Sequence, residues 1–326
     1  MNKLKKALLG STAYAMALAT GVLAVPMLAP AASAQDYTTG AISGTVTTPS
    51  GEPVAGATVT MVSQSQGFTR ELTTGANGAF RATLLPQGDY TVRITAPGYT
   101  DMSDTIRITV GGQSNYAFQA VPAGTSDVIT VTGSAVQQLQ FQQTTSGLNI
   151  DVSEMMATLP IGRSIEALVQ LAPTVVQGDS AFGAVGGAAN VPAIGGGSSA
   201  ENAFYINGLN ITNFDTYVGG ATVPFDFYQN VEVKNGGYPA EFGRATGGVI
   251  NGVTKSGTNE FMFAIHGNWT PQSLRTQSPD TYLSRNAFDD NTTWDVTVEA
   301  GGALIPDRLF AYGLYQHNDY YNSNAS

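Results

Sequence analysis

The chain has no cysteine in its 326 residues and only two histidines, His266 and His317. The absence of cysteine excludes disulfide bonds, thiol catalysis and cysteine-bound metal, so exported domains of this chain must be held together by packing alone. Neither histidine belongs to a metal-binding pattern such as HExxH. No nucleophile stands in a pattern with a base, and acidic pairs such as Asp289-Asp290 are typical of loops. The sequence therefore predicts no enzyme, no metal site and no cofactor.

Positive charge is also scarce, with 14 lysines and arginines against 24 aspartates and glutamates and a net charge of −10. A nucleic-acid partner would require a basic patch, so this balance argues against one. After the first 34 residues no apolar run is long enough for a membrane helix, and any later crossing of a membrane would have to use β-strands. Glycine is abundant, at 38 residues, which favours an exported, mainly β protein.

The first 34 residues have the three parts of a secretory signal peptide. These parts are a basic start at Lys3, Lys5 and Lys6, an apolar run over 13–29 and an A-x-A cleavage pattern at Ala32-Ser33-Ala34. Cleavage after Ala34 would make Gln35 the first mature residue and would leave the chain three charges more negative. A transmembrane anchor is the alternative, and Pro26 and Pro30 argue against it because they interrupt the apolar run. We therefore expect the protein to be exported.

Residues 41–121 alternate short strand-like runs with turn signals, among which Asn77-Gly78 is the strongest. Apolar residues alternate within these runs, as at Tyr90, Val92 and Ile94, which predicts one face in a core. Runs of this number and spacing predict a β-sandwich of about 80 residues. The expected strands are 41–47, 57–62, 68–73, 80–84, 90–94, 106–110 and 116–120.

A family resemblance accompanies this pattern. It rests on GTV and GEPVAGATV within 44–59, NGAF at 77–80 and GDYTVRITAPGY at 88–99. Together these phrases resemble the carboxypeptidase regulatory-like domain, a transthyretin-like sandwich that is sometimes grouped with carbohydrate-binding folds. The resemblance implies an accessory module and not a peptidase.

The most unusual stretch is 231–260, VEVKNGGYPAEFGRATGGVINGVTKSGTNE, which contains seven glycines. Glycine packs little and loses the most entropy on ordering, so we expect this stretch to run close against other backbone. The stretch resembles the closing segment of the plug domain in TonB-dependent outer-membrane receptors, where the plug leads into the barrel. The resemblance implies an α+β plug over 135–258. It assigns structural roles in that plug to Arg163, Asn207, Gly208, Arg244, Gly247, Gly248 and Asn251.

Other segments of 135–258 agree with a plug. The apolar spacing predicts short helices over 151–158 and 163–171, and Asn207-Gly208 predicts a tight hairpin within 203–213. The glycine- and alanine-rich segment 183–197 lacks the Gly-Lys-Ser/Thr of a phosphate-binding loop. We therefore expect it to be a plug loop on the outer side and not a nucleotide site.

Between the two expected domains, residues 122–134 have the composition of a flexible linker followed by a β-forming peptide. The plug resemblance implies that this peptide is the TonB box, an extended segment that adds its backbone to the edge of a sheet in TonB. The alternative is that it forms the first strand of the plug. The expected TonB contacts are Asp127, Val128, Ile129, Thr130, Val131, Thr132 and Gly133.

Residues 259–326 alternate as the strands of an outer-membrane barrel do. The alternation runs through 260–269, 293–302 and 309–318, and it places Phe261, Phe263, Ile265 and Trp269 on one face. A soluble sandwich would also alternate, and it is the alternative for this region taken by itself.

The connections between these strands also suit a barrel. The long polar segment 271–291 is expected outside the cell, and the tight turn 305–308 is expected in the periplasm. A receptor barrel of this type has about 22 strands, whereas this sequence supplies three. Since open strand edges in lipid leave backbone groups unsatisfied at several kcal/mol each, we expect the sequence to be an amino-terminal fragment or a truncated form of a receptor.

Two arginines, Arg163 and Arg244, lie in segments of the expected plug that are otherwise poor in charge. One hypothesis pairs them with carboxylates that face the barrel lumen, such as Glu299 or Asp295. The other hypothesis is that each arginine faces solvent.

The leading hypothesis is therefore the amino-terminal part of a TonB-dependent outer-membrane receptor for the energised uptake of an extracellular substrate. It implies TonB and outer-membrane lipid as partners, and it leaves the substrate unknown. The alternative is an exported binding module that uses the sandwich, with carbohydrate as one candidate ligand. Its candidate aromatic residues are Tyr90, Tyr99, Tyr116 and Phe118.

Overall fold

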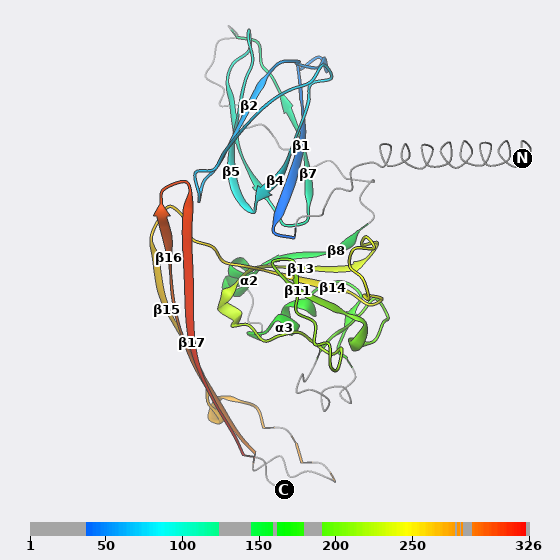
Figure 1. The fold of residues 1–326 in the computed structure, drawn as a ribbon, viewed down its shortest axis with the longest axis vertical. Coiled ribbons are helices and arrows are strands. Elements are labelled where there is room, and N and C mark those ends of the chain that lie inside the picture. The colour runs from blue at the N-terminus through cyan, green and yellow to red at the C-terminus, as the bar shows by residue number, and fades with distance from the viewer. Residues whose placement is uncertain are drawn as a thin grey trace, which may run out of the picture. The chain divides into compact units, whose positions relative to one another are not determined.

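The computed structural model describes residues 37–123, 145–158, 162–178, 191–277, 279–280, 282 and 289–323. These residues form mainly β-strands, as the sequence predicted (Figure 1). The expected signal peptide, the peptide 127–133 and residues 183–190 of the expected outer loop lie outside the described residues. Three regions follow one another along the chain: the sandwich at 39–123, the middle region at 145–258 and the terminal strands at 262–323.

The sandwich has a strand in every range where the sequence predicted one. The strands are β1 (Thr39–Thr47), β2 (Thr58–Ser63), β3 (Thr69–Thr73), β4 (Ala79–Pro86), β5 (Gly88–Thr95), β6 (Met102–Ile108) and β7 (Gln113–Gln119). One sheet has the order β4-β1-β7 and the other has the order β3-β2-β5-β6. The pair β1 and β7 is parallel, and the other neighbouring strands are antiparallel.

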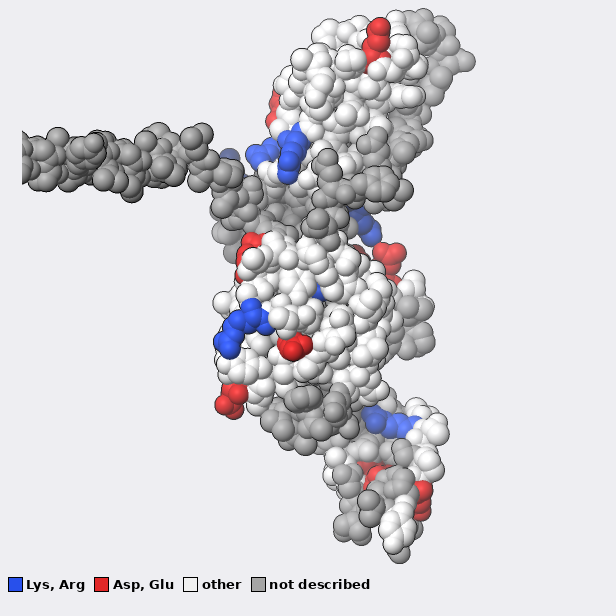
Figure 2. All heavy atoms as spheres, turned by 90° about the vertical axis from the view of Figure 1, so that its right-hand side faces the viewer, with Lys and Arg blue, Asp and Glu red and all other residues white. Residues whose placement is uncertain are grey.

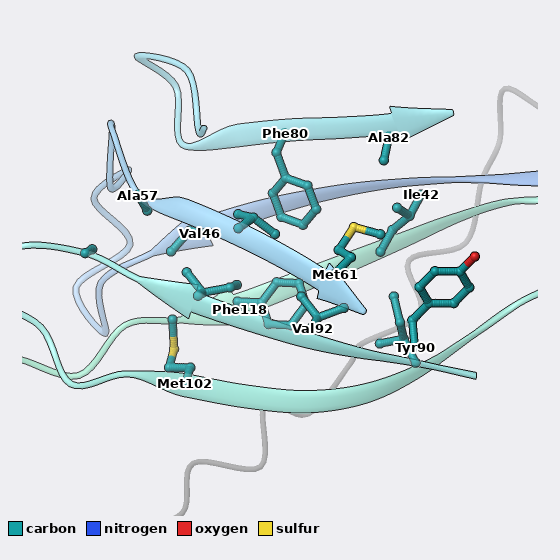
Figure 3. Close-up of a cluster of buried hydrophobic side chains, with 14 of the residues drawn as sticks. Ile42, Val46, Ala57, Met61, Phe80, Ala82, Tyr90, Val92, Met102 and Phe118 are labelled. Atoms are coloured by element: carbon teal, nitrogen blue, oxygen red, sulfur yellow. The ribbon is translucent and has the colours of Figure 1, made fainter. Parts of the chain in front are cut away.

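A single apolar core fills the space between the two sheets (Figure 3). The alternation of Tyr90, Val92 and Ile94 correctly predicted their inward face, because all three side chains are at most 1% exposed. The hydroxyl of Tyr90 donates a hydrogen bond to the carbonyl of Pro86 at 2.9 Å. Burial raises the pKa of Tyr90 to about 12, so its ring stays neutral inside the core at physiological pH.

The middle region contains a five-stranded mixed sheet in the order β12-β11-β14-β13-β8 and a separate two-stranded sheet of β9 and β10. The pair β11 and β14 is parallel, and the other neighbours in the large sheet are antiparallel. The strands are β8 (Ser146–Asp151), β9 (Val175–Val176), β10 (Ala193–Ile194), β11 (Ala203–Ile206), β12 (Leu209–Asn210), β13 (Tyr228–Gly236) and β14 (Val249–Thr254).

The helices of the middle region are short. They are α2 (Val152–Thr158), α3 (Ile165–Val169) and the 3-10 turns η2 (Ser199–Glu201) and η3 (Phe225–Phe227). The hydroxyl of Ser164 accepts from the backbone N–H of Ala167 and caps α3. The sequence predicted a longer helix over 163–171, but the last bonds are of the 3-10 type and Pro173 follows, which disfavours helical backbone before it. No helix in the described residues is long and apolar enough to cross a membrane.

The terminal strands form a three-stranded antiparallel sheet in the order β15-β16-β17. Their bounds are β15 (Met262–Thr270), β16 (Asp290–Ile305) and β17 (Leu309–Ser323), with the 3-10 turn η4 (Gln272–Leu274) after β15. The predicted tight turn joins β16 to β17, and Asp307 takes the left-handed backbone conformation there, with φ of 59°. Ile305 pairs with Leu309 at its base.

The two faces of this sheet differ as the alternation predicted. Phe261, Phe263, Ile265 and Trp269 are between 58% and 77% exposed. On the other face, Thr297 and Glu299 are buried. A sheet with a wide apolar exposed face and a polar covered face has the residue distribution of barrel strands that face lipid on one side and the lumen on the other.

Candidate functional site

Close packing explains the glycines of the stretch 231–260. A Cβ atom at Gly248 would lie 2.5 Å from the side chain of Ile194, and one at Gly252 would lie 2.4 Å from the ring of Tyr228. Both distances are far below van der Waals contact, so only glycine fits at Gly248, directly before β14, and at Gly252, within β14, without a shift of the neighbouring side chains. At Gly257 the obstruction is backbone, because a Cβ there would lie 2.5 Å from the carbonyl oxygen of Ala311.

The expectation that backbone lies against backbone is therefore correct at Gly257, whereas side chains fill the space beside Gly248 and Gly252. The ring of Tyr228, which occupies the space above Gly252, is itself buried. Burial raises the pKa of Tyr228 to about 12, and the carboxylate of Glu166 adds to the shift. The ring is therefore neutral and packs as an apolar group.

The predicted hairpin turn at Asn207-Gly208 is present between β11 and β12. Both residues have positive φ, 49° for Asn207 and 82° for Gly208, as a two-residue turn of this kind requires. The Asn207 side chain donates to the hydroxyl of Thr254 at 3.0 Å and accepts from its backbone N–H at 3.1 Å. The turn is thus tied to the end of β14, next to the point where the chain leaves the sheet.

A buried asparagine, Asn202, organises the entry to β14. Its side chain accepts from the N–H of Gly248 at 3.0 Å and donates to the carbonyl of Pro192 at 2.6 Å. The N–H of Gly247 donates to the carbonyl of Glu201 at 3.1 Å. Sequence reasoning missed Asn202, because a single asparagine before a strand carries no pattern that distinguishes it from a loop residue.

Asn251, in the centre of β14, is 1% exposed. Its amide donates to the backbone carbonyl of Tyr37 at 2.8 Å. The Tyr37 ring stacks on Tyr205, with 5.6 Å between ring centroids, and meets the edge of Phe242 at 5.4 Å. Asn251 therefore fixes the residues that precede β1, which sequence reasoning did not anticipate.

Charged side chains are few, at 12% of the sequence, and on the face shown in Figure 2 they stand singly or in small groups. Lys234 is nevertheless buried, with a side chain that is 4% exposed, and it pairs with Glu232 two residues earlier on the same face of β13. Its ammonium group also lies 5.6 Å from the centroid of the Phe242 ring. The partly buried Glu232 carboxylate thus compensates the buried charge of Lys234 within one strand.

The hypothesis that Arg163 pairs with Glu299 or Asp295 is wrong. Arg163 Nη2 instead lies 2.5 Å and 2.6 Å from the two carboxylate oxygens of Asp226, and its guanidinium lies 5.5 Å from the centroid of the Phe225 ring. Arg163 directly precedes the cap of α3, and Asp226 is the central residue of η3. The ion pair therefore joins two segments within the middle region.

Glu299 takes its cation from Lys255, directly after β14. Lys255 Nζ lies 2.9 Å from Glu299 Oε2, and His266 Nε2 lies 2.9 Å from Oε1. The hydroxyl of Tyr312 on β17 donates to the same carboxylate. Glu299 is 3% exposed, so Lys255, His266 and Tyr312 meet around one buried carboxylate at the junction between the middle region and the terminal strands.

An aromatic contact accompanies this cluster. The rings of Phe227 and Tyr312 are stacked, with 5.8 Å between centroids and an interplanar angle of 27°. Asp295, the other carboxylate in the hypothesis, accepts from the amide of Asn268 at 2.9 Å. The sequence carries no signal that identifies Lys255 as the partner of Glu299, because Lys255 lies outside the paired strands and strand register does not predict its position.

Arg244 also pairs with neither Glu299 nor Asp295. It donates from Nη2 to the hydroxyl of Tyr217 at 3.2 Å, and its guanidinium carbon lies 4.8 Å from the centroid of the Tyr217 ring. Both side chains are exposed, so the hypothesis of an arginine at the surface is closer to the structure for this residue.

The aromatic candidates for a carbohydrate site do not form an exposed surface. Tyr90 and Phe118 are at most 1% exposed, and Tyr99 and Tyr116 pack against the sandwich core. No group of three or more His, Asp and Glu side chains in the described part of the chain is arranged to hold a metal ion.

Two family models match the chain at the regions described above. Residues 41–121 match the carboxypeptidase regulatory-like domain. Residues 140–249 match the TonB-dependent Receptor Plug Domain. The chain therefore combines a regulatory-like sandwich with a plug domain of the TonB-dependent receptor type. From here on the middle region is called the plug.

One curated protein is similar in sequence to nearly the whole chain. The chain is 28% identical over 320 residues to the TonB-dependent transporter Oar of Myxococcus xanthus. The alignment covers 91% of this chain and 29% of the relative, so the chain spans less than a third of that protein's length.

Solved structures are similar to about a quarter of the chain. The TIE protein of Bacillus anthracis is 19% identical with a TM-score of 0.24, over 26% of this chain and 17% of that one. The 5-hydroxyisourate hydrolase of Klebsiella pneumoniae is 25% identical with a TM-score of 0.22, over 26% and 92% respectively. Likenesses with these TM-scores carry no argument about function.

Proposed function

We propose that this chain supplies the plug and the first barrel strands of a TonB-dependent outer-membrane receptor that takes up an extracellular substrate. The observation that carries the proposal is the junction at Lys255. There a sheet that matches the plug model leads directly into strands with an exposed apolar face, and Lys255 is ion-paired to Glu299 on one of those strands.

The exposed face of the terminal strands supports a place in the outer membrane. Phe261, Phe263 and Ile265 alternate along the chain and project from one side of the sheet, where lipid would cover them. Glu299 and Thr297 face the opposite side, where the plug lies against Glu299 through Lys255. In water such an apolar face would be a liability, whereas in a bilayer it is required.

Energy for uptake has to come from a partner in the periplasm, because the outer membrane holds neither an ion gradient nor ATP. The expected contact with TonB is the peptide 127–133, which lies outside the described residues. Its β-branched residues and single charge suit the addition of a strand to the edge of a sheet in TonB.

Substrate would bind on the outer side, at plug loops that include 211–222 and residues of 183–197, together with loops of the barrel. A pull on the peptide 127–133 would then have to move the plug away from the barrel wall. Contacts that resist this movement include the Lys255–Glu299 ion pair and the stacked rings of Phe227 and Tyr312.

The proposal is tested by the binding of the purified TonB periplasmic domain to the full chain in detergent, with Val128→Pro as the variant. Proline removes a backbone N–H that an added strand would need, so we expect affinity to fall by about tenfold or more. Val128→Thr keeps the N–H and the β-branched shape and serves as the matched control. Equal binding by Val128→Pro and the unmodified chain would contradict the proposal.

A further inference from the structure

Among the described residues of the plug, one cation is not paired with a carboxylate. Residues 145–258 contain Arg163, Lys234, Arg244 and Lys255. Within the described residues, Arg163 pairs with Asp226, Lys234 with Glu232 and Lys255 with Glu299. Arg244 contacts the ring and hydroxyl of Tyr217 instead.

The segment that carries Arg244 is fixed from both sides. The hydroxyl of Tyr238 shares its one hydrogen between the carbonyl oxygens of Ala245 and Gly247, which lie at 2.9 Å and 3.1 Å. Phe242 is 3% exposed and packs in the aromatic cluster with Tyr205 and Tyr238. Arg244 therefore projects from a segment held by buried neighbours, although its own side chain is exposed.

The loop that carries Tyr217 is also closed on itself. Thr212 and Gly220 form an antiparallel bridge at its base, and the N–H of Tyr217 donates to the carbonyl of Asn213 at 2.8 Å. The next residue, Val218, is 3% exposed and anchors the loop to the plug core. Two separately fixed segments thus bring the arginine and the tyrosine together.

This arrangement leaves the guanidinium ready for an anion. The guanidinium carbon lies over the Tyr217 ring, Nη2 donates to the hydroxyl of Tyr217, and the other N–H groups have no protein partner among the described residues. A planar guanidinium matches a carboxylate through two parallel hydrogen bonds, and stacking on an aromatic ring limits the rotamer freedom that such binding would cost. Exposed Phe214, on the same loop as Tyr217, adds apolar surface.

We propose that Arg244 and Tyr217 form a subsite on the plug for a ligand that carries a carboxylate next to an apolar or aromatic group. The proposal rests on the proposed function in one respect, namely that this ligand is the substrate or part of it. The opposing view is that the pair only clamps two loops together, in which case an added carboxylate would leave Arg244 as accessible as before.

Chemical labelling of arginine with phenylglyoxal tests the subsite in the full chain in detergent. The probes are N-acetylphenylalanine and N-acetylphenylalaninamide, which differ in the negative carboxylate, and ionic strength is held constant with sodium chloride. Mass spectrometry quantifies labelling at Arg244 and at exposed Arg308 in the same molecules. Arg308 has no carboxylate partner among the described residues and is the internal control.

We expect the acid to slow labelling of Arg244 saturably, by about threefold or more at millimolar concentration, and to leave Arg308 unchanged. The amide should have no effect at either position. Protection of Arg308 to the same degree, or equal protection of Arg244 by the amide, would overturn the subsite.

Two variants of Tyr217 separate the subsite from a simple loop clamp. Tyr217→Phe keeps the ring under the guanidinium and should retain most of the protection by the acid, whereas Tyr217→Leu should lose most of it. Equal protection in both variants would contradict the role of the ring. Val128→Pro should leave the labelling pattern unchanged, so a failure of the TonB contact and a failure of the subsite are distinguishable.

Discussion

Lys255 Nζ lies 2.9 Å from Oε2 of Glu299, and this contact joins the end of the plug sheet to the central terminal strand. The carboxylate is 3% exposed and also receives His266 and Tyr312. A buried carboxylate with three partners is costly to leave incomplete, because desolvation of the charge is then no longer compensated. The plug is therefore attached to the terminal strands by an ion pair whose loss leaves the buried charge of Glu299 uncompensated.

Loss of the lysine should weaken this attachment. We expect Lys255→Met to lower the free energy of unfolding of the junction by about 2–4 kcal/mol, because Glu299 keeps its charge without its cation. Hydrogen exchange at β14 and β16 would report the change. In a double-mutant cycle, Lys255→Met with Glu299→Gln should cost less than the sum of the two single changes. Additive effects would contradict a direct pair.

The arginine clamp inside the plug should tolerate no replacement by lysine. One nitrogen of Arg163, Nη2, contacts both oxygens of Asp226, and the guanidinium also lies 5.5 Å from the centroid of the Phe225 ring, a combination that the non-planar lysine ammonium does not reproduce. We expect Arg163→Lys to cost about 1–2 kcal/mol of plug stability in urea unfolding. Arg308→Lys, at an exposed arginine without a carboxylate partner among the described residues, is the matched control and should be neutral. A neutral Arg163→Lys would show that the guanidinium adds no stability beyond that of any cation at this position.

The packing around the stretch 231–260 predicts that replacing its glycines with alanine will change stability to different degrees. A methyl group at Gly252 would collide with the ring of Tyr228, so we expect Gly252→Ala to destabilise the plug by about 1–3 kcal/mol. Gly243 has open space around the position of a Cβ, and Gly243→Ala should be neutral or slightly stabilising. Urea unfolding of both variants checks this order, and equal effects would contradict the packing described here.

The sandwich should lose stability in alkali through Tyr90. Its pKa is about 12 in the folded chain, against an ordinary value of 10.0. Because the folded pKa is the higher one, the contribution is complete below pH 10 and is lost as pH rises toward 12. At about 1.4 kcal/mol for each pKa unit, the full loss is about 2–3 kcal/mol.

Urea unfolding between about pH 9 and 12 measures this loss. Tyr90→Phe, which cannot ionise, should be less stable than the unmodified chain near neutral pH because the Pro86 carbonyl loses its donor. Its stability should fall less steeply with pH. Parallel pH curves for the two proteins would contradict the assignment to Tyr90.

Local patterns in the sequence predicted the fold well where one residue type decides the backbone. Asn207-Gly208 requires positive φ at two successive positions, and the alternation at Tyr90 and Val92 depends only on which face is buried. The prediction of a long helix over 163–171 was wrong. Apolar spacing shows which residues share a face but not how far the helical hydrogen bonds continue, and Pro173 disfavours helical backbone before it.

The partners of charged residues were not predictable in the same way. Arg163 and Asp226 are 63 residues apart in the sequence. They form an ion pair because the start of α3 lies next to η3 in the folded chain. Lys255 follows β14 directly, and it reaches Glu299 because β16 pairs with β15, the strand that begins at Met262. Such contacts follow from the assembled tertiary structure, and no spacing in the sequence encodes them.

The parallel pairing of β1 with β7 has a mechanical consequence. These are the first and last strands of the sandwich, and they run side by side from Ala41–Gln113 to Thr47–Gln119. A tension applied between the two ends of the domain would act along both strands and in opposite directions. It would load all their backbone hydrogen bonds together in shear, instead of opening them one at a time. The sandwich is thus built to transmit a pull along its length without unravelling from one end.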